Sequence, residues 1–121
     1  MNTQFSEDAN FSDAQFSEDT DFSEAEFNSG ADFIDAQFSK DVSFRNARFT
    51  NDTSFRNARF IEDADFSKAR FSRDADFNSA QFSGYAYFID TQFSTRADFR
   101  SAQFSLTAVF MKPGSAGVHA S

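Results

Sequence analysis

Phenylalanine recurs along this chain with a spacing that alternates between six and five residues. The twenty Phe residues follow this alternation from position 5 to position 110 without an exception. Two residues before each Phe stands a small residue, which is Ala in fifteen of the twenty units. The underlying period is therefore eleven residues, and an internal repeat of this kind indicates a solenoid built from stacked, equivalent units.

The local pattern favours strands over helices. Residues five and six positions apart do not fall on one stripe of an α-helix with 3.6 residues per turn. The Ala-x-Phe unit with a polar central residue is an alternation of period two, which is typical of an extended segment with two side chains inward. The Ser, Asn, Asp and Gly residues that follow Phe favour turns. Each unit is thus predicted to be a very short strand followed by a corner.

The composition supports a core of equivalent sites. The chain has 20 Phe, no Trp and few aliphatic residues, whereas an ordinary core mixes shapes that interdigitate. We therefore expect each Phe to stack on the same position in the coils above and below it. The central members of this predicted core are Phe22, Phe33, Phe44, Phe55, Phe60, Phe66, Phe77 and Phe88.

The units at 31–35, 64–68 and 75–79, among others, read Ala-Asp-Phe followed by two variable residues. These units resemble the pentapeptide-repeat family, whose unit is a small residue, Asp or Asn, then Leu or Phe, then two variable positions. The resemblance covers roughly residues 3–112. It implies a right-handed, four-sided β-helix in which the small residue and the Phe point inward.

The sequence departs from that family pattern because every second unit carries a sixth residue. Four sides would then take 22 residues, which gives about five coils and a rod about 24 Å long at about 4.8 Å per coil. The alternative is a two-sided solenoid with 11 residues per coil. Like charges stacked on neighbouring strands are destabilising. Eleven-residue coils would place Arg48, Arg59 and Arg70 in one column, whereas 22-residue coils place Glu26 beside Arg48, so we favour four sides.

The repeats predict a single solenoid domain over residues 1–112 and a flexible C-terminal tail over residues 113–121, because Pro113 and Gly114 end the pattern. Leu106, Val109 and Met111 are apolar substitutions clustered in the last coil. They form a candidate end interface for a homodimer or an end-to-end assembly. Tyr85 and Tyr87 also interrupt the polar outer positions, and exposed aromatic pairs often mark interfaces.

Catalytic chemistry finds little support in the sequence. There is no Cys, and the only His, His119, lies in the tail. The Ser and Asp residues repeat along the rod with none distinguished, and the Gly-rich loops typical of calcium-binding solenoids are missing. We therefore expect no catalytic residue, no metal, no cofactor and no enzyme activity. The sequence shows neither a secretory signal nor a run of about 20 apolar residues, so we expect a cytoplasmic protein without membrane contact.

The net charge of −8 is concentrated at one end, since residues 1–40 hold ten acidic groups and one basic group. Acidic chains do not generally bind nucleic acid, so direct nucleic-acid binding is not expected. We expect a structural or protein-binding scaffold whose partner is unknown. The family resemblance implies an alternative, because some members imitate DNA and bind DNA gyrase or topoisomerase IV. The phosphate surrogates on the acidic outer positions would then be Asp21, Asp32, Asp65, Asp76 and Asp98.

Overall fold

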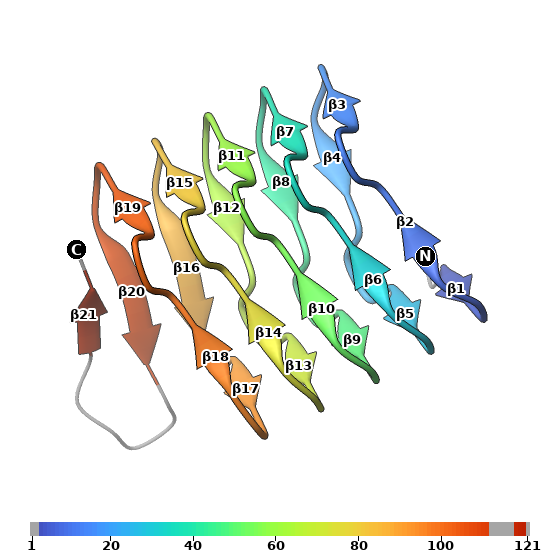
Figure 1. Ribbon diagram of the computed structural model, residues 1–121. Coiled ribbons are helices and arrows are strands. Elements are labelled where there is room, and N and C mark those ends of the chain that lie inside the picture. The colour runs from blue at the N-terminus through green and yellow to red at the C-terminus, as the bar shows by residue number, and fades with distance from the viewer. Residues whose placement is uncertain (1–2, 112–117, 121) are drawn as a thin grey trace.

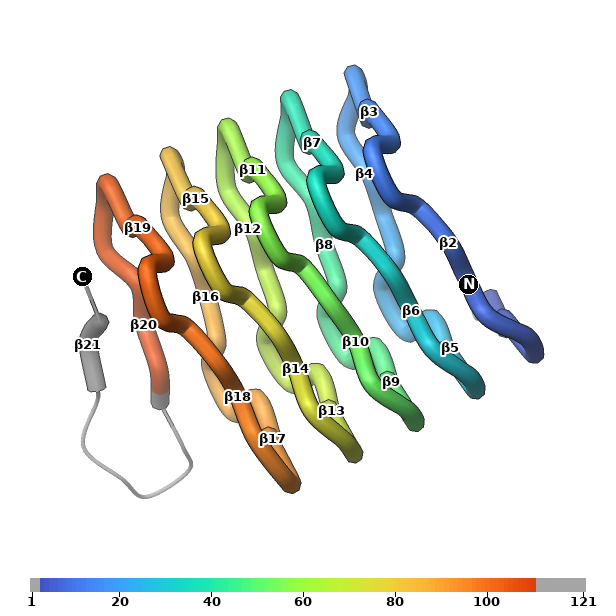
Figure 2. Tube along the Cα trace, in the orientation of Figure 1, coloured from blue at the N-terminus to red at the C-terminus, as the bar shows by residue number. Residues whose placement is uncertain are grey.

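The computed structural model describes residues 3–111 and 118–120 and shows a right-handed solenoid of five coils (Figure 1). Each coil has four short strands, one on each of four sheets, and the tube in Figure 2 follows the chain once around the rod per coil. Paired positions are 22 residues apart, as in Phe60, which pairs with Phe38 and Phe82. The four-sided coil is therefore confirmed, and the 11-residue coil is wrong.

The chain visits sheets A, B, C and D in that order, so sheet A faces sheet C and sheet B faces sheet D across the core. Sheet A consists of β1 (Gln4–Phe5), β5 (Glu26–Phe27), β9 (Arg48–Phe49), β13 (Arg70–Phe71) and β17 (Gln92–Phe93). Sheet B consists of β2 (Ala9–Asn10), β6 (Ala31–Asp32), β10 (Thr53–Ser54), β14 (Ala75–Asp76) and β18 (Ala97–Asp98).

The other two sheets complete the coil. Sheet C consists of β3 (Gln15–Phe16), β7 (Gln37–Phe38), β11 (Arg59–Phe60), β15 (Gln81–Phe82) and β19 (Gln103–Phe104). Sheet D consists of β4 (Thr20–Asp21), β8 (Val42–Ser43), β12 (Ala64–Asp65), β16 (Ala86–Ile89), β20 (Ala108–Met111) and β21 (Val118–Ala120). All neighbours within the five coils are parallel, and the described residues form no helix that could cross a membrane.

The Phe residues fill the core as four columns, one behind each sheet. Within a column, neighbouring rings stack with centroids 4.6–5.1 Å apart and planes 1–9° from parallel. The columns of sheets B and D also meet edge to face, as in Phe44 with Phe33 and Phe55 at 5.5 and 5.4 Å. Both arrangements are preferred by aromatic quadrupoles, so the coil spacing and the ring geometry reinforce each other.

The expected core is confirmed in the central coils. Seven of the eight Phe residues named from the sequence are 0–1% exposed, and Phe22 is half-buried in the first coil, where the described structure stacks only Phe44 on it within its column. The small residues between the rings, such as Ala58 and Ala69, are also fully buried. A small side chain is needed at these positions because the large ring two residues later occupies the remaining space.

The five-residue corners follow sheets B and D and share one turn geometry. At each of them, the N–H of the third residue after Phe donates to the carbonyl of that Phe, as Ala69 donates to Phe66. The residue before that donor has a positive φ, such as 63° at Lys68 and 60° at Asn57, which is the third position of a type II turn. None of the nine residues at this position is Gly, although left-handed backbone costs a residue with a side chain about 1–2 kcal/mol.

Lys68→Gly is expected to raise the free energy of unfolding, and Lys68→Val to lower it. Glycine removes the strain of the φ of 63°, at the cost of about 0.4–1 kcal/mol of extra entropy in the unfolded chain, so the net gain is under about 1 kcal/mol. A β-branched side chain makes the strain worse. Urea denaturation of the two variants should differ by about 1–2 kcal/mol in this order. The reverse order would contradict the turn assignment.

The structure describes one further strand in the C-terminal segment. Residues 118–120 form β21, which pairs antiparallel with Ala108–Phe110 of β20, and the flexibility of the tail stays a prediction. An edge strand leaves backbone N–H and C=O groups open for pairing, and β21 occupies those of β20. The rest of the predicted tail, residues 113–117 and 121, lies outside the described residues.

Candidate functional site: the acidic columns and the corner between sheets C and D

The inserted sixth residues form two columns, one at the corner before sheet B and one before sheet D. The column before sheet B is Asp8, Gly30, Asp52, Asp74 and Arg96, and the column before sheet D is Asp19, Asp41, Asp63, Tyr85 and Thr107. Four of the six inserted Asp residues bind the backbone of the next coil. Asp41 Oδ1 accepts the N–H of Asp63 at 3.0 Å, and Asp63 Oδ1 accepts the N–H of Tyr85 at 2.9 Å.

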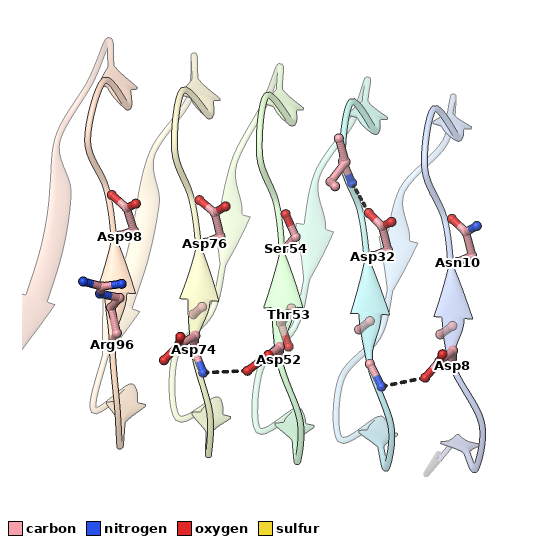
Figure 3. Close-up of a pocket in the computed structure, with 15 residues that line it drawn as sticks. Asp8, Asn10, Asp32, Asp52, Thr53, Ser54, Asp74, Asp76, Arg96 and Asp98 are labelled. Atoms are coloured by element: carbon pink, nitrogen blue, oxygen red, sulfur yellow. Dashed lines mark hydrogen bonds between the residues drawn. The ribbon is translucent and has the colours of Figure 1, made fainter.

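The same bond recurs on the other side of the rod. Asp8 Oδ1 accepts the N–H of Gly30 at 3.0 Å, and Asp52 Oδ1 accepts the N–H of Asp74 at 3.2 Å (Figure 3). Each bond joins residues 22 positions apart and satisfies an N–H at the six-residue corner. The inserted Asp is thus a structural ladder between coils, which agrees with the corner role that Asp commonly has in turns.

The five acidic residues named from the sequence do not lie on one face. Asp32, Asp76 and Asp98 stand on sheet B, whereas Asp21 and Asp65 stand on sheet D across the core. Two acidic faces, each holding an outward column and an inserted column, therefore run along opposite sides of the rod. Figure 3 shows the sheet B face, where the two columns lie side by side.

These five carboxylates also build the five-residue corners. Each accepts the backbone N–H two residues ahead: Asp21 from Ser23, Asp32 from Ile34, Asp65 from Ser67, Asp76 from Asn78 and Asp98 from Arg100, at 2.8–3.0 Å. Ser43 and Ser54 make the equivalent bond with their hydroxyl groups. A short polar residue stands before Phe in all five coils of sheet B and in the first three coils of sheet D, and this bond explains it. The longer Gln, Glu and Arg residues of sheets A and C do not make the bond in the described structure.

Arginine side chains form ion pairs with three of these five residues and so offset their negative charge. Arg45 lies 3.5 Å from Asp65, Arg56 lies 3.6 Å from Asp76, and Arg100 lies 2.9 Å from Asp98. The first two pairs join neighbouring coils. These ion pairs are largely exposed, so each contributes little to stability, but together they lower the negative potential of both faces in the second half of the rod.

Each acidic face is hollowed between its two columns. The groove on sheet B has a volume of about 530 Å³ and is lined by residues of all five coils, among them Asp8, Asp52 and Asp98. The groove on sheet D has a volume of about 380 Å³, and its lining includes Asp19, Asp41 and Asp63, with Tyr87 in the fourth coil. Among the described residues, no group of three or more His, Cys, Asp or Glu is arranged to hold a metal ion.

The stability of the rod is expected to fall as the pH drops below 3.8, the ordinary pKa of Asp. The hydroxyl of Ser29 and the N–H of Gly30 lower the pKa of Asp8, and the hydroxyl and N–H of Ser23 lower that of Asp21. The bonded guanidinium of Arg100 holds the pKa of Asp98 well below its usual range. A pKa that is lower in the folded state means that protons bind the unfolded chain more tightly. The stabilisation that these carboxylates provide is therefore complete above pH 3.8, and it is lost as the pH falls through their lower pKa values in the folded state.

Denaturation midpoints measured between about pH 5 and pH 2 should therefore decrease steadily. Asp8→Asn and Asp98→Asn keep an acceptor oxygen but remove the titrating group, and they should flatten this dependence. A midpoint that does not change over this range in the unmodified protein would contradict the role of the carboxylates.

The described residues include two of the three side chains of the candidate end interface. Leu106 is 46% exposed at the corner between sheets C and D, and Val109 is half-buried on β20, beside the pairing with β21. The side chain of Met111 lies outside the described residues. Leu106 is not alone at its corner, since Ile61 and Tyr85 are 40% and 45% exposed there in the two preceding coils. Tyr85 was expected from the sequence to mark an interface, but its proximity to Ile61 and Leu106 at this corner was not expected.

Gly84 holds the backbone of this corner close to the coil before it. A Cβ atom at Gly84 would lie 2.5 Å from the backbone carbon of Glu62 and 2.7 Å from Asp63 Oδ1. Gly84→Ala is therefore expected to cost about 1–3 kcal/mol, measured by chemical denaturation. Gly30→Ala is the matched control, because its Cβ would meet only ordinary contacts, the nearest at 3.4 Å from Asp8 Oδ1. Equal losses in the two variants would contradict the close approach at Gly84.

Comparison with known proteins supports the architecture. The family described as pentapeptide repeats (9 copies) matches residues 2–48 and 34–81, which together span two thirds of the chain. No curated protein and no solved structure matches the chain. The family match, the inward small residue and Phe, and the four parallel sheets at 22-residue intervals agree. This chain belongs to the pentapeptide-repeat family.

Proposed function

We propose that the chain is a non-enzymatic scaffold whose rigid outer faces bind other proteins or support self-assembly. The observation that carries this proposal is the single register that runs through all five coils. The Phe columns fill the interior, and the recurring Asp and Ser side chains bind backbone N–H groups at the corners. These polar groups therefore have a structural role. None of them is paired with a neighbouring base, as a catalytic nucleophile would be.

Two measurements test the scaffold proposal together. Affinity capture from the source cells with immobilised protein should retain a partner that binds in a saturable manner. Alternatively, small-angle scattering should show a rod that lengthens beyond about 24 Å as its concentration rises, which is the behaviour of a self-assembling element. A rod that stays discrete at every concentration and retains no saturable partner would overturn the proposal.

Self-association through the last coil is the more specific form of the self-assembly proposal. Leu106 and Val109 expose apolar surface there, and strand edges are common sites of association. Val109→Ser introduces the residue that Ser43 already supplies in the same column of sheet D. If the last coil mediates a dimer, this variant should shift sedimentation velocity profiles towards the monomer, and an unchanged dimer would exclude Val109 from the interface.

DNA mimicry is the second candidate, and the two acidic faces on opposite sides of the rod favour it. The opposing consideration is the pairing of Asp65, Asp76 and Asp98 with arginine residues. A DNA gyrase supercoiling assay with and without a quinolone tests this candidate. Inhibition or protection that weakens in Asp65→Asn/Asp76→Asn, which keeps both corner acceptors, would support it. No effect from protein shown to be folded by circular dichroism would remove it.

A further inference from the structure

The large apolar side chains that the described structure exposes gather along one edge of the rod. Ile61, Tyr85 and Leu106 are 40%, 45% and 46% exposed, and they stand in the third, fourth and fifth coils at the corner between sheets C and D. Tyr87 lies beside Tyr85 on sheet D, with ring centroids 6.3 Å apart. We call these four residues the corner patch. Single exposed apolar residues need no explanation, but a contiguous group marks an interaction site.

The fold itself does not require apolar residues at these positions. Tyr85 continues a column of Asp41 and Asp63, and Leu106 continues a column of Glu62 and Gly84. The column of Ile61 contains Ser in the other four coils, and the column of Tyr87 contains Asp or Ser in the first three coils and Val109 in the last. The four apolar residues therefore replace repeat residues without adding to the core, and Tyr87 replaces an Asp or Ser that caps the corner elsewhere on sheet D.

The groove beside the corner patch is lined by five carboxylates, of which Asp65 is paired with Arg45. The groove on sheet D runs from Asp19 in the first coil to Tyr87 in the fourth, which is about 14 Å at about 4.8 Å per coil. The structural bonds of Asp41 and Asp63 each use one carboxylate oxygen, Oδ1. Desolvation and then the negative charge of Asp63 raise the pKa of Tyr87, which agrees with a negative potential at the end of the groove.

We propose that the corner patch and the adjoining groove bind an extended, basic segment of a partner protein. An apolar side chain of that segment rests on the corner patch, and Lys or Arg side chains extend into the groove towards Asp41 and Asp63. The groove length corresponds to about four residues of extended chain. Cations bind both carboxylates and the faces of tyrosine rings, so one basic segment satisfies both parts of the surface.

Charge decides between this partner and a second copy of the chain. A second copy carries the same net charge of −8, and one bound through the same corner patch would bring its own acidic groove beside this one. Like charges at an interface are strongly unfavourable, whereas a basic segment is complementary. The proposal rests on the proposed function in its protein-binding form, and it names one surface and one class of partner for it.

The variants that test the proposal use residue types that the repeats already contain. The patch-free variant removes the corner patch without changing the charge, and it combines Ile61→Ser, Tyr85→Asn, Tyr87→Ser and Leu106→Gln. Asp41→Asn/Asp63→Asn removes two charges and keeps both Oδ1 acceptors. The matched controls lie on the sheet B side, where Ile34→Ser removes a half-buried apolar residue and Asp52→Asn/Asp74→Asn removes two charges.

The experiment is the selection of a random dodecapeptide library displayed on phage against the unmodified protein, with an excess of the patch-free variant as soluble competitor. The expected peptides combine several Lys or Arg residues with an aromatic or aliphatic residue. Fluorescence anisotropy of the synthetic peptides should show binding at least about tenfold weaker for the patch-free variant and for Asp41→Asn/Asp63→Asn. Binding to the two controls should be unchanged.

Three results would overturn the proposal. The first is a selection that yields no peptides specific for the unmodified protein, or peptides without basic residues. The second is equal binding to the unmodified protein and the patch-free variant. The third is a dimer of the unmodified protein that sedimentation velocity shows to be absent in the patch-free variant, since the occupant is then a second copy. In each of these cases, capture of the same cellular partner by the unmodified protein and by the patch-free variant would show that the scaffold function stands although this surface is rejected.

Discussion

Phe55→Ala should lower the free energy of unfolding by about 3–5 kcal/mol, the range found for large cavities in packed cores. Phe55 is 0% exposed. Its ring stacks on Phe33 at 4.8 Å and on Phe77 at 5.0 Å, and it meets Phe44 and Phe66 edge to face at 5.4 and 5.3 Å. Phe49 also meets it edge to face, at 6.2 Å. Removing one ring therefore breaks a column and three edge contacts at once, and the neighbouring coils cannot close the gap without changing their spacing.

Two variants separate this effect from a general sensitivity of the chain. Phe55→Leu keeps most of the volume and should cost clearly less than Phe55→Ala. Phe99→Ala removes a half-buried ring of the last coil in the same column and should also cost less. Urea or guanidinium denaturation measures all three. A loss below about 1 kcal/mol for Phe55→Ala would mean that the ring is not in a close-packed core.

Ala58→Leu should cost about 3 kcal/mol, near the upper end of the usual effect of overpacking. Ala58 is 0% exposed on sheet C, where the small position is Ala in all five coils. Its neighbours in the column, Ala36 and Ala80, are also fully buried. The additional carbon atoms would have to displace the Phe rings or separate the coils, and either change breaks the ladder of hydrogen bonds between coils.

Sheet D offers the matched control for this overpacking. Val42 already occupies the small position there, 2% exposed, and it pairs with Ala64 in the next coil. Ala64→Val should therefore cost less than about 1.5 kcal/mol, because sheet D accommodates a branched side chain one coil away. The two variants are compared by denaturant midpoint at constant m-value. Equal costs for Ala58→Leu and Ala64→Val would contradict the difference between the two sheets.

The coil could be predicted from the sequence because its evidence is periodic. The Phe spacing indicated stacked units, and the charges indicated the coil length. The structure places Glu26 beside Arg48 and places Arg59 between Gln37 and Gln81, as the 22-residue coil requires. Avoidance of like charges was only a partial guide, since Arg48 and Arg70 are neighbours on sheet A. Their exposed, flexible side chains can point apart, which makes this contact tolerable.

The roles of the Asp residues could not be predicted in the same way. The partner of Asp41 is the N–H of Asp63, 22 residues ahead, so the bond becomes apparent only once the coil is built. The distribution of Asp21 and Asp32 over opposite faces likewise depends on the order of the four sheets. A local signal was nevertheless present, because short polar residues precede Phe at the five-residue corners, with Tyr87 as the exception, and long residues precede it where a six-residue corner follows.

The corner patch was dispersed in the sequence for a related reason. Ile61, Tyr85 and Leu106 occupy three different positions of the six-residue corner, so no single column of the repeat displays them together. Only the position of that corner in successive coils brings them to one edge. Departures from a repeat thus become informative when they are placed on the coil, because the repeat itself shows which residues the fold requires.

Engineered disulfides test the 22-residue coil most directly, because the chain contains no Cys of its own. Gln37 and Arg59 are direct partners on neighbouring strands of sheet C, and adjacent strands lie about 4.8 Å apart, within the range that a disulfide can bridge. Arg48 and Arg59 lie on opposite sheets. Gln37→Cys/Arg59→Cys should form an intramolecular disulfide under mild oxidation, and Arg48→Cys/Arg59→Cys should not. The reverse result would contradict the four-sided coil.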